Sequence, residues 1–135
     1  MKTSRNTIQR NLVLQAVRAL HQHPTAEEVY RETVKYHPNI SKGTVYRNLN
    51  LLAQRGDILK VEIPGGADHF DFKVAGHYHV YCRICGGVYD IDMPYLDGLM
   101  DMVRDAQGFQ LESGNILFKG ICPNCKSQEQ QKEKI

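Results

Sequence analysis

Apolar residues in the first 56 positions recur every three or four residues in three segments. This spacing predicts helices over residues 7–20, 25–36 and 41–55, each with one buried face. The second segment opens with Thr25, followed three residues later by Glu28, which is the pattern of a capping box; the third opens with a serine, a preferred N-cap. The buried faces of the first and third helices are predicted to carry Ile8, Leu12, Val13, Ala16, Val17 and Leu20, and Val45, Leu49, Leu52 and Ala53.

After these helices the apolar residues adopt the shorter period of a strand. Two such runs, 58–63 and 69–72, flank the turn sequence Pro-Gly-Gly-Ala and predict a hairpin. Three short helices followed by a hairpin are the elements of a winged helix-turn-helix, whose third helix enters the major groove of DNA.

The rest of the chain predicts strands over 88–91 and 116–118, with a helix over 95–106 between them. We therefore expect an α+β protein with a winged helix-turn-helix over residues 1–72 and a small α/β domain over residues 73–135. No apolar run approaches the length of a membrane span, and the first residues lack the apolar core of a signal peptide. The chain is therefore expected in the cytoplasm.

The net charge of +2 is divided unevenly along the chain. Residues 1–60 hold ten Lys and Arg but only four Asp and Glu. Residues 61–135 hold seven Lys and Arg and eleven Asp and Glu. A basic first half suggests an anionic partner for the helical module, although a modest basic excess is also found on ordinary solvated surfaces.

The third predicted helix offers polar side chains suited to double-stranded DNA. Three of them, Ser41, Lys42 and Thr44, lie at its N-terminus, where backbone N–H groups favour phosphate. The other three, Tyr46, Arg47 and Asn50, lie on its outer face, where they can stack or bond to base edges. The alternative is an ordinary polar surface on a small helical domain. The candidate DNA-binding residues are Ser41, Lys42, Thr44, Tyr46, Arg47 and Asn50.

The four cysteines form two Cys-x-x-Cys pairs, Cys82 with Cys85 and Cys122 with Cys125. Thiols stay reduced in the cytoplasm, and four thiolates complete a closed tetrahedral Zn²⁺ site of the structural kind. One Cys-x-x-Cys pair would suffice for thioredoxin-like chemistry, and no His-x-Glu motif precedes the cysteines as in zinc deaminases. The pattern therefore favours structural zinc.

Two histidines, His77 and His79, directly precede the first cysteine pair. In an extended segment both imidazoles project to one face, while Cys82 has the opposite parity, so the sequence suggests a second metal site. Carboxylates between apolar residues need a partner, and three nitrogens with two carboxylates suit Fe²⁺, Mn²⁺ or Zn²⁺. The candidate ligands of this second site are His23, Asp71, His77, His79 and Asp90.

Taken together, these motifs resemble those of the ferric uptake regulator family over nearly the whole chain. The motifs that carry the resemblance are Ile8-Gln-Arg10, His23-Pro-Thr25, Ser41-x-x-Thr-Val-Tyr-Arg47-Asn-Leu49, Phe70-Asp-Phe72, His77-x-His79, Cys82-x-x-Cys-Gly86 and Cys122-x-x-Cys125. The resemblance implies a homodimeric, metal-dependent repressor, without enzymatic activity, that binds a DNA operator. It also implies that the second domain is a dimerisation domain and that a regulatory Fe²⁺ or Mn²⁺ lies at the hinge.

Aspartates stand at positions 71 and 90, where iron-sensing members of that family typically carry glutamates. The peroxide-sensing repressors of the family typically carry aspartates at these positions. The resemblance is therefore greatest to this group, in which oxidation of histidine ligands ends DNA binding. Ser113-Gly-Asn115 stands where many members carry a further histidine, and the chain starts close to its first helix, so we expect neither a third metal nor an extra leading helix.

Two alternatives to a peroxide sensor remain at this point. One is an iron-sensing repressor of metal uptake genes. The other is a zinc-stabilised interaction or redox module that does not bind DNA.

Overall fold

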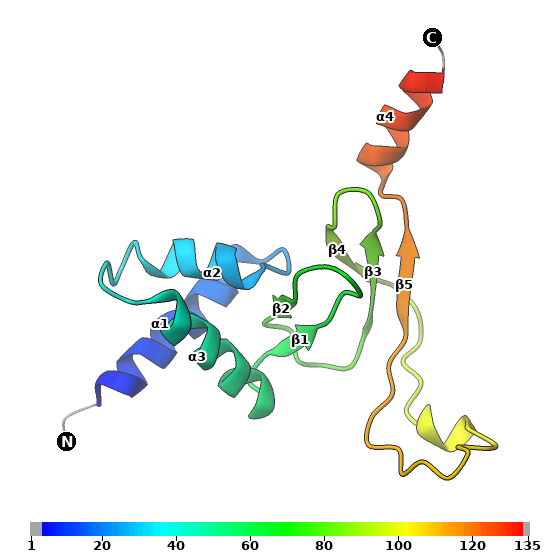
Figure 1. Cartoon of the computed structure of the whole chain (residues 1–135), viewed down its shortest axis with the longest axis horizontal. Coiled ribbons are helices and arrows are strands. Elements are labelled where there is room, and N and C mark those ends of the chain that lie inside the picture. Colours follow the sequence, from blue (N-terminus) through cyan, green and yellow to red (C-terminus); the bar gives the residue numbers. More distant parts are fainter. Residues whose placement is uncertain (1–3, 134–135) are drawn as a thin grey trace. The chain divides into compact units, whose positions relative to one another are not determined.

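The computed structural model of the chain describes residues 4–133. Its contacts divide the chain into two compact units, Met1–Ala75 and Gly76–Ile135. The first unit holds three helices and a hairpin, and the second holds a three-stranded sheet and a C-terminal helix (Figure 1). The α+β class predicted from the sequence is confirmed. The expectation that no extra helix precedes the first one concerns the extreme N-terminal residues, and these lie outside the described part of the chain.

The three predicted helices are present: α1 (Arg5–Leu20), α2 (Ala26–Thr33) and α3 (Lys42–Gln54). Each begins after a hydroxyl side chain that accepts a hydrogen bond from a backbone N–H of the first turn. The capping box at the start of α2 is confirmed, since Thr25 and Glu28 satisfy each other's backbone N–H groups.

Helix α2 ends at Thr33, three residues earlier than predicted. The chain then continues in tight turns, with Tyr36 N–H bonded to the carbonyl of Thr33. A proline at position 38 has no N–H to donate to the carbonyl of residue 34, and its ring would clash with that carbonyl in a helix, so the helix does not extend through this turn.

The core of the first unit is formed by the inner faces of its helices and by residues of the hairpin. One predicted core position is wrong: Ile8 is 47% exposed, while Gln9 is buried. At 3.6 residues per turn, Gln9 lies about 40° from Val13 around the helix and Ile8 about 140° from it. The buried residues of this core are Val13, Ala16, Val17, Val29, Ile40, Val45, Leu49, Leu52, Ile58 and Phe70.

The predicted hairpin is present as β1 (Leu59–Val61) and β2 (His69–Asp71), paired antiparallel. All three residues of β2 are buried. Strand β2 is also held to the loop before α2, because Phe70 N–H donates to the carbonyl of Pro24 at 2.8 Å. The hairpin therefore fixes the segment that carries His23.

In the second unit, β3 (Tyr78–Cys82) is the central strand of a sheet with the order β4-β3-β5. It pairs antiparallel with β4 (Val88–Ile91) and parallel with β5 (Leu117–Gly120). Both predicted strands are thus present, the second shifted by one or two residues. Helix α4 (Pro123–Glu133) was not predicted, since its polar sequence carries no apolar stripe.

The predicted helix over residues 95–106 is wrong. That segment contains only the 3₁₀ turn η1 (Met100–Met102). Its apolar side chains are largely exposed, with Met102 at 67% and Val103 at 47%. A short helix is marginal unless its apolar face is packed, and apart from Tyr95, which stacks on Tyr78, most apolar side chains of this segment remain exposed. Across the described residues, no helix combines the length and apolar character needed to cross a bilayer.

Candidate metal centres and nucleic-acid interface

The four cysteines meet at one end of the sheet of the second unit. Cys82 ends β3 and Cys85 follows in the turn to β4, while Cys122 precedes α4 and Cys125 lies in its first turn. Their four sulfur atoms lie within 4.8 Å of one another, and Cys85 Sγ and Cys122 Sγ are 3.9 Å apart. A tetrahedral site with Zn–S bonds of about 2.3 Å requires sulfur atoms about 3.8 Å apart, so the cluster fits Zn²⁺.

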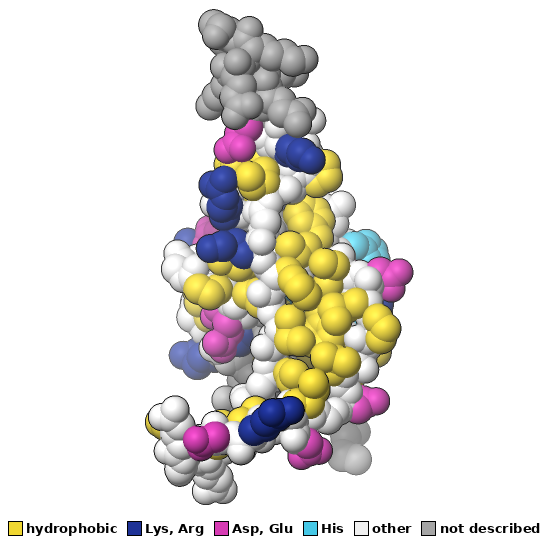
Figure 2. Space-filling model, turned by 90° about the vertical axis from the view of Figure 1, so that its right-hand side faces the viewer, with side chains coloured by type: hydrophobic (Ala, Val, Ile, Leu, Met, Phe, Trp, Pro, Cys, Tyr) yellow, Lys and Arg dark blue, Asp and Glu magenta, His cyan; other side chains and the backbone are white. Residues whose placement is uncertain are grey.

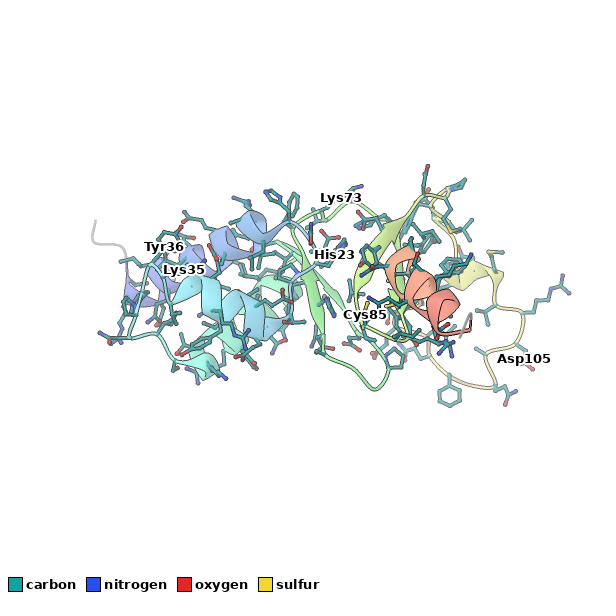
Figure 3. All side chains as sticks on the ribbon, turned by 90° about the horizontal axis from the view of Figure 1, so that it is seen from above. His23, Lys35, Tyr36, Lys73, Cys85 and Asp105 are labelled. Carbon is teal, nitrogen blue, oxygen red and sulfur yellow. The ribbon has the colours of Figure 1, made fainter. Side chains whose placement is uncertain are left out.

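The electrostatics of the cysteine cluster also favour a cation. The backbone N–H of Cys122 donates to Cys82 Sγ at 3.4 Å and holds the pKa of the Cys82 thiol at about 6. The Cys122 side chain beside Cys125, together with burial, raises the pKa of the Cys125 thiol to about 12. Four adjacent thiols cannot all ionise alone, but a bound dication stabilises all four thiolates. Figure 3 shows Cys85 beside α4.

The first unit brings two further candidate ligands together. His23 lies in the loop before α2, with a left-handed backbone (φ 51°), and its Nε2 lies 3.1 Å from Asp71 Oδ2 on β2 (Figure 3). Both side chains are buried, at 10% and 4% exposure. A buried carboxylate is costly without a partner, and left-handed geometry in a residue other than glycine is uncommon outside constrained sites.

His69 holds this pair of residues in place. Its Nδ1 lies 2.6 Å from the backbone carbonyl of His23, and since a carbonyl only accepts, Nδ1 carries the proton. The backbone N–H of Lys73 donates to Asp71 Oδ1 at 2.9 Å, which orients the carboxylate. Sequence reasoning missed His69, although its place directly before Phe-Asp-Phe was a possible signal.

The second unit brings together the other three candidates. His79 on β3 is directly opposite Asp90 on β4 in the strand register. His77 Nε2 and His79 Nε2 lie 3.0 Å and 3.4 Å from Asp90 Oδ1, and the two imidazole rings are 4.4 Å apart. Each unit therefore carries a half-site: one imidazole and one carboxylate in the first, two imidazoles and one carboxylate in the second.

The candidate DNA-binding residues lie along α3 of the first unit. Ser41 caps the helix, and Thr44 Oγ1 accepts a hydrogen bond from an Arg47 guanidinium nitrogen at 3.2 Å. Tyr46 and Arg47 are exposed on the outer side of the helix. Asn50 Oδ1 accepts a hydrogen bond from Lys60 Nζ of the hairpin at 3.3 Å.

An acidic residue of α2, Glu27, contacts this surface and was not identified from the sequence. Glu27 Oε2 lies 3.0 Å from Lys42 Nζ and accepts a hydrogen bond from Tyr46 Oη at 3.5 Å. The Lys42 hydrogen bond lowers the pKa of Glu27, and Glu27 in turn raises that of Lys42. The contact joins two helices, so spacing within either helix gave no signal for it.

Known proteins resemble this chain over most of its length. The peroxide-responsive repressor PerR of Staphylococcus epidermidis is 31% identical over 124 residues, covering 92% of this chain and 83% of that protein. The peroxide operon regulator of Bacillus subtilis is 30% identical and covers 93% and 86%, respectively. The crystal structure of the Campylobacter jejuni peroxide stress regulator matches with a TM-score of 0.69 at 29% identity, covering 89% of this chain and 90% of that one.

A model of the ferric uptake regulator family matches residues 2–119, which include both strands of the hairpin, both half-sites and the first cysteine pair. The match therefore spans the three capped helices, the hairpin and most of the cysteine-bearing sheet. The chain belongs to the ferric uptake regulator family.

Proposed function

We propose that the chain is a metal-dependent, dimeric transcriptional repressor that responds to peroxide. The observation that carries the proposal is the division of the five nitrogen and oxygen ligands into two half-sites, one in each unit. An ion that needs all five ligands stabilises the arrangement in which both half-sites reach it. Metal binding then shifts the population towards the arrangement of the DNA-binding unit that this ion favours.

Two metals are assigned to the chain. The four thiolates of Cys82, Cys85, Cys122 and Cys125 suit a structural Zn²⁺, because the site is closed and contains only sulfur. The mixed set of three imidazoles and two carboxylates suits Fe²⁺ or Mn²⁺ as the regulatory ion. The ligands of the second ion are His23, Asp71, His77, His79 and Asp90.

The proposed signal is peroxide. Relatives that are 30–31% identical carry names that refer to peroxide, and aspartates stand at both carboxylate positions of this chain. The five ligands would hold Fe²⁺, which would supply the redox chemistry that cleaves the O–O bond of peroxide: one oxygen would be transferred to a neighbouring imidazole and the other would leave as water. His23 and His77 are the side chains expected to gain oxygen. An oxidised imidazole is a poor ligand, so the half-sites lose their common ion and the repressor leaves DNA.

The proposed DNA contacts are those of α3. Lys42 lies beside its N-terminus and favours phosphate, while Arg47 carries the fork of donors that matches the edge of guanine. Such a repressor is a regulator and not an enzyme, and it works in the cytoplasm with the DNA that it binds. The full proposed set is Ser41, Lys42, Thr44, Tyr46, Arg47 and Asn50.

The proposed dimer uses the second unit. Figure 2 shows hydrophobic side chains gathered into a band on the side where β5 forms the edge of the sheet. A band of this kind on a small unit indicates a partner surface, and a second copy covers it in our proposal. Exposed apolar residues of this unit include Ile84, Tyr89, Tyr95, Leu96, Phe109 and Phe118.

A titration of fluorescent duplex DNA tests this function. Fluorescence anisotropy is followed with manganese-loaded protein, with and without a chelator that leaves the structural zinc in place. We expect tight, salt-sensitive binding that the chelator reverses. Equal binding in both conditions would show that the second metal does not control DNA affinity. No binding would favour the zinc-stabilised interaction module.

A further inference from the structure

A polar groove of about 480 Å³ lies in the first unit between the start of α1 and the outer side of α3. We refer to it as the arginine groove, because three guanidinium groups from two helices converge on it. Amide side chains complete most of its polar lining. The residues that define the arginine groove are Arg5, Arg10 and Arg47, with Asn6, Gln9 and Asn48.

The charge of the arginine groove is not neutralised. No carboxylate is among the described residues that line it, and none of its three arginines forms an ion pair with a described carboxylate. Other cations of the same unit do have such partners: Lys42 with Glu27, and Lys35 with Glu32. Three like charges held close together without a counterion favour an anion.

Arg10 adds a specific hydrogen-bonding reason. Its Nε–H is buried and has no acceptor among the described residues. A buried donor on a charged group costs free energy until an acceptor is found. An oxyanion in the groove provides several acceptor oxygens, and a change of side-chain rotamer lets the guanidinium present two donors to it.

We propose that the arginine groove binds a phosphate group of the DNA backbone. The inference rests on the proposed function and extends it to α1, which contributes Arg5 and Arg10. Planar guanidinium groups bind phosphate through paired hydrogen bonds, and such contacts fix the register of a protein on the duplex without reading its sequence. The groove includes Arg47 of α3, so a phosphate held there lies beside the base that Arg47 contacts.

The experiment uses two duplexes and four proteins. One duplex is selected from a random pool by the manganese-loaded wild-type protein, and the other is a scrambled duplex of equal length. The proteins are wild type, Arg10→Gln, Arg5→Gln and the control Arg18→Gln, which removes the same charge from the last turn of α1. Affinity is measured across a series of salt concentrations, and thermal unfolding confirms that each variant is folded.

We expect Arg10→Gln and Arg5→Gln to weaken binding to both duplexes by the same factor, on the order of tenfold, since the contact is to backbone. The slope of log affinity against log salt should fall by about 0.9 for each lost phosphate contact, while Arg18→Gln leaves the slope near that of wild type. If Arg10→Gln fails to fold, the exposed rim residue Arg5 still decides the outcome.

A second measurement locates the phosphate. Single phosphates of the selected duplex are replaced by neutral methylphosphonate, and the affinity loss at each position is compared between wild type and Arg10→Gln. In each half of the selected duplex, replacement at one phosphate position should weaken DNA binding by the wild type but not by Arg10→Gln. Identical profiles for the two proteins, or an unchanged salt slope, would overturn the inference.

The outcomes separate this inference from the function on which it rests. If the wild type binds the duplexes but Arg10→Gln and Arg5→Gln bind as tightly, the groove assignment fails and the repressor remains. If the wild type binds neither duplex, the proposed function fails as well. Inorganic pyrophosphate is titrated in parallel: saturable binding that Arg10→Gln abolishes, with DNA affinity unchanged, would assign the groove to a free phosphate compound.

Discussion

Glu27 is a carboxylate within the surface that we propose for DNA. It holds Lys42 at 3.0 Å and Tyr46 at 3.5 Å, so two DNA-facing side chains are engaged with an acid in the free protein. A carboxylate near phosphates opposes binding, and its partners must be released before they reach DNA. If this surface binds DNA as we propose, Glu27 sets the affinity below what the basic residues alone would give.

Replacing Glu27 with glutamine should raise affinity for both operator and scrambled DNA several-fold and steepen the salt dependence, since Lys42 becomes available to phosphate. The matched control is Glu32→Gln, on the same helix, which releases Lys35 instead. Affinity that is unchanged in Glu27→Gln, or raised equally in the control, would mean that the contact with Lys42 and Tyr46 does not limit binding.

Arg47 and Lys42 are expected to play different roles at the DNA. Arg47→Ala should reduce the preference for operator over scrambled DNA by about 1–3 kcal/mol, because a base contact is removed. Lys42→Ala should weaken binding to both duplexes alike and flatten the salt dependence. Anisotropy titrations with both duplexes check this. An operator preference that survives Arg47→Ala would show that α3 does not read the sequence in this way.

Among the elements, strand β2 joins the fold to the proposed regulatory site. It carries Asp71 itself, and through the 2.6 Å contact of His69 it fixes the carbonyl of His23. Removing a residue that hydrogen-bonds to and orients a metal ligand typically weakens metal affinity by about 10-fold to 100-fold. Replacing His69 with phenylalanine keeps a ring of similar size and removes this hydrogen bond.

We expect His69→Phe to weaken Mn²⁺ binding by about 10-fold or more while zinc content stays at the wild-type level. Calorimetric titration with Mn²⁺ and metal analysis measure the two quantities separately. His37→Phe, which removes an imidazole after α2 in the same unit, serves as the control. Equal Mn²⁺ affinity in His69→Phe and wild type would show that the strand does not position His23.

The elements also show how far the sequence predicts the structure. The three helices and the hairpin were predictable because their signals are local: Thr25 and Glu28 cap α2 by direct contact. The segment 95–106 has an apolar pattern, but most of its apolar side chains are exposed, so the local pattern misled. Candidate ligands could be found by residue type and spacing. The contacts of Glu27 and His69 join separate elements, so spacing within one element does not reveal which residues they contact.

At the scale of the whole molecule, the cysteine cluster is expected to hold the second unit together. Bound structural zinc contributes folding free energy on the order of 10 kcal/mol. Cys122→Ser should therefore lose tightly bound zinc and the dimer. Metal analysis combined with light scattering checks this prediction. A stable, zinc-free dimer of the Cys122→Ser protein would refute the assignment of four thiolates to one ion.

In the proposed mechanism the response to peroxide depends on both units, because His23 belongs to the first and His77 to the second. Manganese does not readily make the one-electron exchange with peroxide that iron makes, so the two metals separate the chemistry from metal binding itself. Cysteine oxidation is the competing explanation, and thiolates in a closed zinc site should react more slowly than a free thiolate.

The measurement that tests the account most directly compares iron-loaded with manganese-loaded protein at equal peroxide, following DNA binding and mapping added oxygen by peptide mass spectrometry. We predict that the iron form loses DNA irreversibly and gains oxygen on His23 and His77, while the manganese form keeps its DNA. If both forms lose DNA together, or if the oxygen maps to the cysteines with both histidines intact, the peroxide-sensing account is contradicted and an iron-sensing repressor replaces it.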